Sequence, residues 1–310
     1  MRVDLITGFL GAGKTTFIRK YVTYLKEKGE RFRIIENEFC AWGVDTKLLE
    51  DTHDDIRDLS GYCMCCTGKD KFISMLAEAG QEGYDRVLVE PSGIYDVDEF
   101  FSVMHAPVVA AYCEIGSVIT VLDVYSPEEE SRESSYLMLT QLLAAGCILI
   151  SKTLLFDERT KENTLAFVSR KLSPYLADGH VPMVISKDWD ELTKEDFEAI
   201  RNSGFYKVSH EHLAMDHGSV YDTWMSMAFC TDEAELNGKI DRMFHDPACG
   251  HVLRVKGYAK DSRGIWFAVN CTGDVLDIQQ ADIKRGLLIV IGQDLNEEAL
   301  KEIVSGPSGT

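Results

Sequence analysis

The chain has 310 residues, of which 45% are hydrophobic and 27% charged, and its formal net charge at pH 7 is -19. This length predicts a main domain and a smaller second one, and the composition excludes a globally disordered chain. Because so acidic a surface repels phosphate backbones and anionic lipids, neither a nucleic acid nor a membrane is an expected partner.

Short apolar runs alternate with helical patterns through the first two thirds of the chain. Strands that alternate with helices form a parallel sheet covered on both faces, so this region is predicted to be an α/β domain. The expected strands are Val3–Thr7, Phe32–Glu36, Arg86–Glu90, Val118–Asp123, Cys147–Ser151 and Pro182–Ser186. The clearest expected helices are Lys14–Lys28, Lys69–Ala79, Ser134–Ala145 and Glu158–Leu176.

The alternation ends near Gly204, and a different pattern follows it. Four runs predict a small, mostly antiparallel sheet: Tyr221–Phe229, His251–Gly257, Gly264–Asn270 and Leu287–Ile291. The helical patterns that would pack on this sheet are Asp232–Phe244 and Leu295–Val304. With the boundary in the polar stretch Ser209–Ser219, the sequence predicts an α/β domain over residues 1–208 and a smaller α+β domain over residues 219–310.

The segment Gly8–Thr15 reads GFLGAGKT and fits the phosphate-binding P-loop pattern. It lies between an expected strand and an expected helix, which is the context that this motif requires. Lys14 would contact the β- and γ-phosphates, and the Thr15 hydroxyl would ligate Mg2+. The small residues that would let backbone N–H groups reach phosphate oxygens are Gly8, Gly11, Ala12 and Gly13. We therefore predict a P-loop NTPase domain that binds a nucleoside triphosphate with Mg2+.

Read onward from this loop, nearly the whole chain resembles the CobW-type metallochaperone GTPases, relatives of the HypB and UreG nickel-insertion proteins. The segments that carry the resemblance are Gly8–Thr16 (GFLGAGKTT), Glu36–Phe39 (ENEF), Gly43–Asp45 (GVD), Cys63–Cys66 (CMCC) and Glu90–Gly93 (EPSG). Weaker similarities in the second domain are Arg254–Gly257 and Ile291–Gly292. The resemblance adds Thr16 to the nucleotide contacts. It implies GTP hydrolysis coupled to the delivery of a transition metal such as zinc or cobalt.

The same resemblance implies roles for three residues outside the loop. Glu90 ends an expected strand at the carboxyl edge of the sheet, where open α/β folds bind ligands, so it would reach Mg2+ directly or through water. Gly93 would offer its backbone N–H to the γ-phosphate. Asp45 lies in the segment that resembles switch I and would contact Mg2+ or the attacking water, although an ordinary turn acid is an equal interpretation. Lys14, Glu90 and Asp45 are thus the catalytic candidates.

One element departs from the family pattern. The family reads guanine with an Asn/Thr-Lys-x-Asp element after the fifth strand, but this chain has Ser151–Leu154, which reads SKTL. Leu154 stands where the acid would accept two hydrogen bonds from guanine, so the sequence leaves both GTP and ATP open as the nucleotide. Lys152 would still pack its stem along the purine ring. Asp157 is the nearest substitute acid, three residues too late for the usual geometry.

Cys63, Cys65 and Cys66 form a tight group of thiols. Thiolates suit Zn2+ and other borderline metals, but three ligands leave a tetrahedral site incomplete, so Glu38, water or a client protein would supply the fourth. An incomplete shell suits a carrier that must release its metal. The alternative interpretation is a redox or buried thiol cluster that holds no metal.

The three histidines near the domain boundary have no assigned role. His210, His212 and His217 are candidates for an auxiliary metal site, but solvated loop residues are the more frequent explanation of such a group.

The leading functional hypothesis is an NTPase that uses GTP or ATP with Mg2+ to deliver zinc or another transition metal to a client protein. A P-loop small-molecule kinase and a nucleotide-gated scaffold for a metalloenzyme or corrinoid protein are the alternatives. The sequence leaves a homo-oligomer open. Because there is no leader pattern, no apolar run of the roughly 18 residues needed to span a bilayer and no disulfide framework, a cytoplasmic protein is expected.

Overall fold

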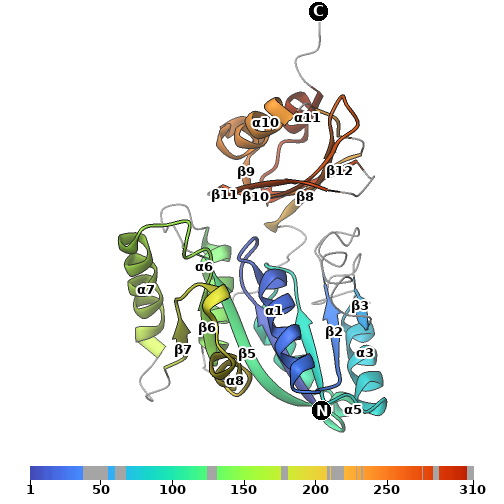
Figure 1. Cartoon of the computed structure of the whole chain (residues 1–310), viewed down its shortest axis with the longest axis vertical. Helices are drawn as coiled ribbons and strands as arrows, with labels where there is room; N and C mark the ends of the chain where they lie inside the picture. The colour runs from blue at the N-terminus through green and yellow to red at the C-terminus, as the bar shows by residue number, and fades with distance from the viewer. Residues whose placement is uncertain are drawn as a thin grey trace, which may run out of the picture. The chain divides into compact units, whose positions relative to one another are not determined.

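The chain divides into two units, Met1–Leu213 and Ala214–Thr310, and each is described by itself. Figure 1 shows their elements with the labels used below. The computed structural model describes residues 1–37, 55–59, 68–123, 131–175, 181–207, 210, 220–227, 229–231, 233–273, 275–281 and 286–305. The residues with predicted site roles that lie outside this description are Glu38, Asp45, Cys63, Cys65, Cys66, His212 and His217.

The first unit is built on a seven-stranded sheet in the order β3-β2-β4-β1-β5-β6-β7, and every neighbouring pair is parallel. Its strands are β1 (Arg2–Thr7), β2 (Phe32–Glu36), β3 (Ile56–Asp58), β4 (Arg86–Glu90), β5 (Glu114–Leu122), β6 (Cys147–Ile150) and β7 (Met183–Ile185). The five residues of β2 and of β4 are all buried, as expected for parallel strands that are covered on both faces. The α/β prediction for this part of the chain is confirmed.

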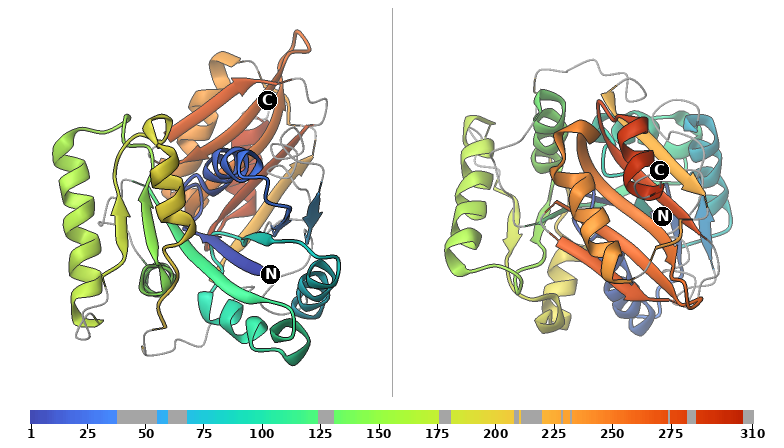
Figure 2. Two further views of the ribbon diagram at one scale, coloured as in Figure 1. Left: turned by 60° about the horizontal axis from the view of Figure 1, so that its bottom comes forward. Right: turned by 90° about the horizontal axis from the view of Figure 1, so that it is seen from above.

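Helices cover both faces of this sheet. The helices of the first unit are α1 (Lys14–Glu27), α3 (Lys69–Gln81), α4 (Val97–Met104), α5 (Pro107–Ala110), α6 (Arg132–Ala144), α7 (Glu158–Leu172) and α8 (Lys194–Arg201), with the short 3-10 helices η2 (Ser173–Tyr175) and η3 (Trp189–Glu191). One buried cluster joins α1 and α8 to the sheet, and the clusters on the other side contain α3, α4, α5, α6 and α7. Figure 2 shows these layers from two further directions.

The second unit is an α+β structure with a five-stranded antiparallel sheet in the order β11-β10-β9-β12-β8. Its strands are β8 (Asp222–Met227), β9 (His251–Lys260), β10 (Trp266–Thr272), β11 (Val275–Gln280) and β12 (Leu287–Gln293). Its helices are α10 (Glu233–His245), α11 (Glu297–Ser305) and the 3-10 helix η4 (Pro247–Cys249). In the right view of Figure 2, α10 and α11 lie across one face of the sheet, and one buried cluster joins them to it.

Two strands and three α-helices were not anticipated from the sequence, and one of these helices, α5, has only four residues. β3 has three residues, and β11 begins three positions after the end of β10, so neither offers a long apolar run. α4 and α8 have eight residues each, which is below the length at which a helical period is distinct. The helix expected over Glu158–Leu176 ends at Leu172, where η2 begins with Ser173-Pro174.

Candidate functional site

The phosphate loop connects β1 to α1. Its glycines have positive φ angles: 142° at Gly8, 75° at Gly11 and 102° at Gly13, in the region that L side chains rarely adopt. Gly13 is the N-cap of α1, so no side chain covers the first turn of the helix. The loop and the helix N-terminus therefore form the backbone cradle that binds phosphate in this motif.

Two glycines let other strands approach this loop. A Cβ on Gly8 would lie 2.1 Å from the carbonyl oxygen of Val121 in β5, which no side chain could occupy. A Cβ on Gly93, after β4, would lie 2.4 Å from the backbone nitrogen of Leu10. The backbone at Gly93 thus lies against the phosphate loop, where the sequence predicts a contact with the γ-phosphate.

Lys14 begins α1 and turns its side chain back along the loop. Its side chain is only 6% exposed, and its ammonium group donates to the carbonyl oxygens of Gly8 at 2.9 Å and Phe9 at 3.3 Å. A buried ammonium group held at the loop supplies the positive charge that phosphate oxygens require. Thr16, also predicted to bind nucleotide, lies beside it in the first turn of α1 and is exposed.

Thr15 and Glu90 meet at the carboxyl edge of the sheet. The Thr15 hydroxyl donates to Oε1 of Glu90 at 2.8 Å, and Glu90, the last residue of β4, is 4% exposed. Glu36 ends β2 in register with Glu90 and is also buried. A hydroxyl and a carboxylate are the hard oxygen ligands that Mg2+ prefers, so this donor set fits the predicted metal ion.

A side chain of α6 holds the segment that follows Glu90. The amide nitrogen of Gln141 donates to the carbonyl oxygens of Gly93 and Tyr95, each at 3.4 Å, and Gln141 is 1% exposed. Sequence reasoning did not identify Gln141, because one polar residue among several in a helix gives no indication of what it contacts.

On the other side of the loop, Lys152 follows β6. It has a positive φ of 57°, and its ammonium group lies 3.1 Å from Oδ2 of Asp123, which follows β5. Leu154 is 76% exposed in the turn that comes next. Asp157, the substitute acid considered from the sequence, is the N-cap of α7 and accepts from the backbone nitrogen of Thr160 at 2.9 Å.

Trp189 packs against the phosphate loop, and the sequence did not predict this contact. A Cβ on Gly13 would lie 3.4 Å from its ring, and its indole N–H donates to the carbonyl oxygen of Ile150 at 3.2 Å. The ring also packs edge-on against Phe17 in α1. Trp189 therefore contacts the end of β6, the phosphate loop and α1 and links these three elements.

His210 is the boundary histidine that the structure describes. Its Nε2 lies 3.2 Å from Oδ2 of Asp98 in α4, and its ring lies near Tyr136. Within the described part of the chain, no three histidine, cysteine or acidic side chains form a group that could hold a metal ion. Nor is any described helix long and apolar enough to cross a bilayer.

Comparison with known proteins gives consistent similarities. The family described as "CobW/HypB/UreG, nucleotide-binding domain" matches residues 2–177. The "Zinc chaperone CobW" of Sinorhizobium sp is 28% identical over 350 residues, which cover 97% of this chain and 95% of that protein. The "Zinc chaperone YeiR" of Escherichia coli (strain K12) is 32% identical over 166 residues, and this match covers 53% of the chain but about half, 49%, of YeiR.

Solved structures give weaker similarities. The Zn(II)-bound YjiA GTPase of E. coli aligns over 100% of this chain and 99% of its own, with 17% identity and a TM-score of 0.40. The hydrogenase maturation factor HypB of Helicobacter pylori, solved in complex with nickel, covers 64% of this chain with 16% identity and a TM-score of 0.41.

Proposed function

We propose that this chain, which belongs to the CobW/HypB/UreG, nucleotide-binding domain family, hydrolyses GTP and couples hydrolysis to the binding and delivery of zinc. The observation that carries the first half is the hydrogen bond between Thr15 and Glu90 beside a buried Lys14. These three side chains bring a phosphate-binding charge and two metal ligands to the mouth of one loop.

Each residue has a distinct part in this mechanism. Loop N–H groups and Lys14 orient the triphosphate, while Thr15 and Glu90 would hold Mg2+, which neutralises charge that develops on the phosphate oxygens. The backbone N–H of Gly93 would respond to the γ-phosphate, so that loss of this phosphate releases the segment after β4. Asp45 would orient the attacking water, as its place in the switch-like segment suggests.

Zinc enters the proposal from two sources. Two relatives are named zinc chaperones, one that matches 97% of this chain and one that matches 53% of it. The chain itself carries Cys63, Cys65 and Cys66 between its loop and Glu90, and Glu38 precedes them. Three thiolates and one carboxylate would bind zinc, while a ligand set shared with the recipient would allow transfer to a client protein.

The decisive experiment titrates reduced, metal-free protein with Zn2+ in the nucleotide-free, GDP-bound and non-hydrolysable GTP analogue-bound states. We expect the zinc affinity to differ between the states by about 5- to 150-fold, and linkage requires zinc to change the affinity for nucleotide by the same factor. Cys65→Ser should lose both zinc and the coupling but keep nucleotide binding. The exposed Cys230 provides the matched control Cys230→Ser, which should keep all three.

Other outcomes distinguish the alternatives. Equal zinc affinities in the three states would sink the gating mechanism, even for a protein that binds zinc and hydrolyses GTP. Phosphate release that requires an added small-molecule acceptor would support the kinase, and a chain that binds nucleotide but no metal would support the scaffold.

A further inference from the structure

The order of the strands gives the direction in which a nucleotide lies on the loop. Thr15 and Glu90 mark the metal and γ-phosphate end, on the side of the loop where β4 flanks β1. On the other side, β5 is the neighbour of β1, and β6 lies beyond β5. Since ligands of open α/β sheets lie across the carboxyl ends of the strands, the nucleoside must extend over the ends of β5 and β6. The base therefore meets the segment Ser151–Leu154.

This segment is a tight turn, and the side chain of Lys152 has a fixed position beside it. The backbone nitrogen of Leu155 donates to the carbonyl oxygen of Lys152 at 2.9 Å, which closes the turn. Asp123 fixes the Lys152 ammonium group at 3.1 Å, so the methylene stem of Lys152 bridges the ends of β5 and β6 and offers a purine ring an apolar surface. Leu154 and Leu155 face solvent at the rim, where they are 76% and 61% exposed.

Acceptors for the N1–H and 2-amino groups of guanine distinguish it from adenine, whose N1 is itself an acceptor. Three described carboxylates that follow β5, β6 and β7 have structural roles. Asp123 pairs with Lys152, and Asp157 caps α7 by accepting from Thr160. Asp188 caps η3 by accepting from the backbone nitrogen of Asp190 at 2.7 Å. Leu154, which can accept nothing, occupies the rim of the turn.

We propose, on the basis of the function proposed above, that the base subsite accepts purine nucleoside triphosphates as a class, and that Leu154 is the residue that sets this breadth. Because the side chain of Leu154 is exposed and can accept no hydrogen bond, the donors of guanine stay hydrated at this position when GTP binds, and adenine meets no acceptor there that would repel its own N1. The phosphate loop and the Lys152 stem then supply the affinity, and neither distinguishes one purine from another.

The test is competition of GTP, ITP, XTP and ATP against a GTP analogue that carries a fluorophore on its ribose. In the unaltered chain we expect the four dissociation constants to agree within about tenfold, with GTP and ITP nearly equal, since Leu154 offers no partner to the 2-amino group that separates them. Leu154→Asp should favour GTP over ITP by about tenfold or more, because hydrogen bonds to a charged acceptor are gained. Leu155→Asp adds the same charge to the neighbouring exposed position and should leave this ratio unchanged.

The possible results separate three claims: the breadth of the base subsite, the position of the base and the proposed function. A GTP affinity more than about 100-fold above those of ITP and ATP in the unaltered chain would overturn the breadth while leaving the proposed function intact. A Leu154→Asp variant with an unchanged ratio and an unchanged melting temperature would show that the base does not meet this turn. The absence of binding by all four nucleotides would instead contradict the proposed function.

Discussion

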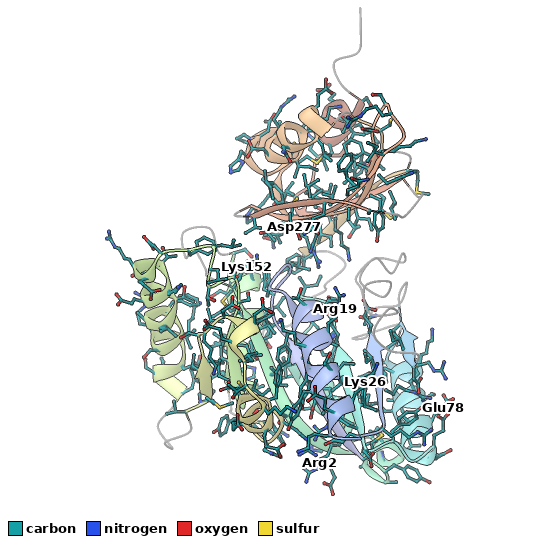
Figure 3. All side chains as sticks on the ribbon, in the orientation of Figure 1. Arg2, Arg19, Lys26, Glu78, Lys152 and Asp277 are labelled. Carbon is teal, nitrogen blue, oxygen red and sulfur yellow. The ribbon has the colours of Figure 1, made fainter. Side chains whose placement is uncertain are left out.

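The two ends of the main sheet both hold buried charges, and they hold them differently. In Figure 3, Arg2 marks the amino end of the strands and Lys152 the carboxyl end. At the amino end, Arg86 donates to both carboxylate oxygens of the fully buried Asp4 and, at 3.0 Å, to Glu30, which also accepts from Arg201. These charges satisfy one another.

At the carboxyl end, neutral groups of the phosphate loop and of α1 bond to buried charges. Lys14 donates to two backbone carbonyl oxygens, and Glu90 accepts from the Thr15 hydroxyl. A charge bonded to a neutral group can exchange this partner for a ligand ion at little cost, whereas removing one member of a buried ion pair leaves the other uncompensated. The comparison predicts that changes at the amino end affect stability and that changes at the carboxyl end affect binding.

The largest effect is expected from Arg86→Met. Loss of the guanidinium leaves Asp4 buried without its partner, so the free energy of unfolding should fall by about 3–5 kcal/mol, while nucleotide affinity in the folded protein is kept. Adding Asp4→Asn to this variant should recover part of the loss. Urea unfolding measures both, and a double variant no more stable than Arg86→Met would contradict the pairing.

The same variant has a predictable pH dependence. Burial raises the pKa of Asp4 above its usual value, against the opposing effects of Arg86 and the Ser117 backbone N–H. A carboxyl group whose pKa is raised by folding contributes stability below its unfolded pKa and loses it as the pH rises. Without Arg86 the pKa of Asp4 rises further, so Arg86→Met should be more destabilising at pH 8 than at pH 4.

A smaller effect, confined to binding, is expected from Lys14→Ala. Loss of the ammonium group should weaken triphosphate binding by about 100-fold or more, since charge-assisted hydrogen bonds to two phosphates are lost. The melting temperature should stay nearly unchanged, because the bonds that Lys14 makes to Gly8 and Phe9 are not part of the core. Calorimetry gives the affinity, with Lys20→Ala on the surface of the same helix as the control. Undiminished affinity would remove the loop from the mechanism.

The smallest effect sharpens the comparison by moving from buried to exposed charge. Hydrogen bonds from Lys28, Tyr24 and Asn202 lower the pKa of Glu198, in α8, to about 2. This carboxylate therefore adds stability above its ordinary pKa of 4.5, and the contribution is lost as the pH falls toward about 2.

Glu198→Gln should accordingly raise the equilibrium constant of unfolding at pH 7 by only about twofold, because solvent screens an exposed pair. The difference from the unaltered chain should disappear near pH 2 and shrink in high salt. Glu162→Gln, on the exposed side of α7, is the control. A difference that persists unchanged at pH 2 would show that the Glu198 charge is not its cause.

Much of the first unit could be predicted because its signals are local. β2 and β4 have the predicted bounds, since each holds a short group of apolar and β-branched residues between polar segments. The class of both units followed in the same way. β3 could not be predicted, because its three residues form a strand only through their register with β2 from Ile34 to Glu36.

By itself, the sequence determined the phosphate loop, its lysine and the acid at the end of β4, because glycine spacing and apolar runs act on neighbouring residues. Only the tertiary structure decided which distant side chains meet. Trp189 contacts Gly13, and Lys152 pairs with Asp123, because the strand order β1-β5-β6-β7 brings the ends of these strands together. The partners of a buried charge are set by packing across the sheet, and no periodicity along the chain records that packing.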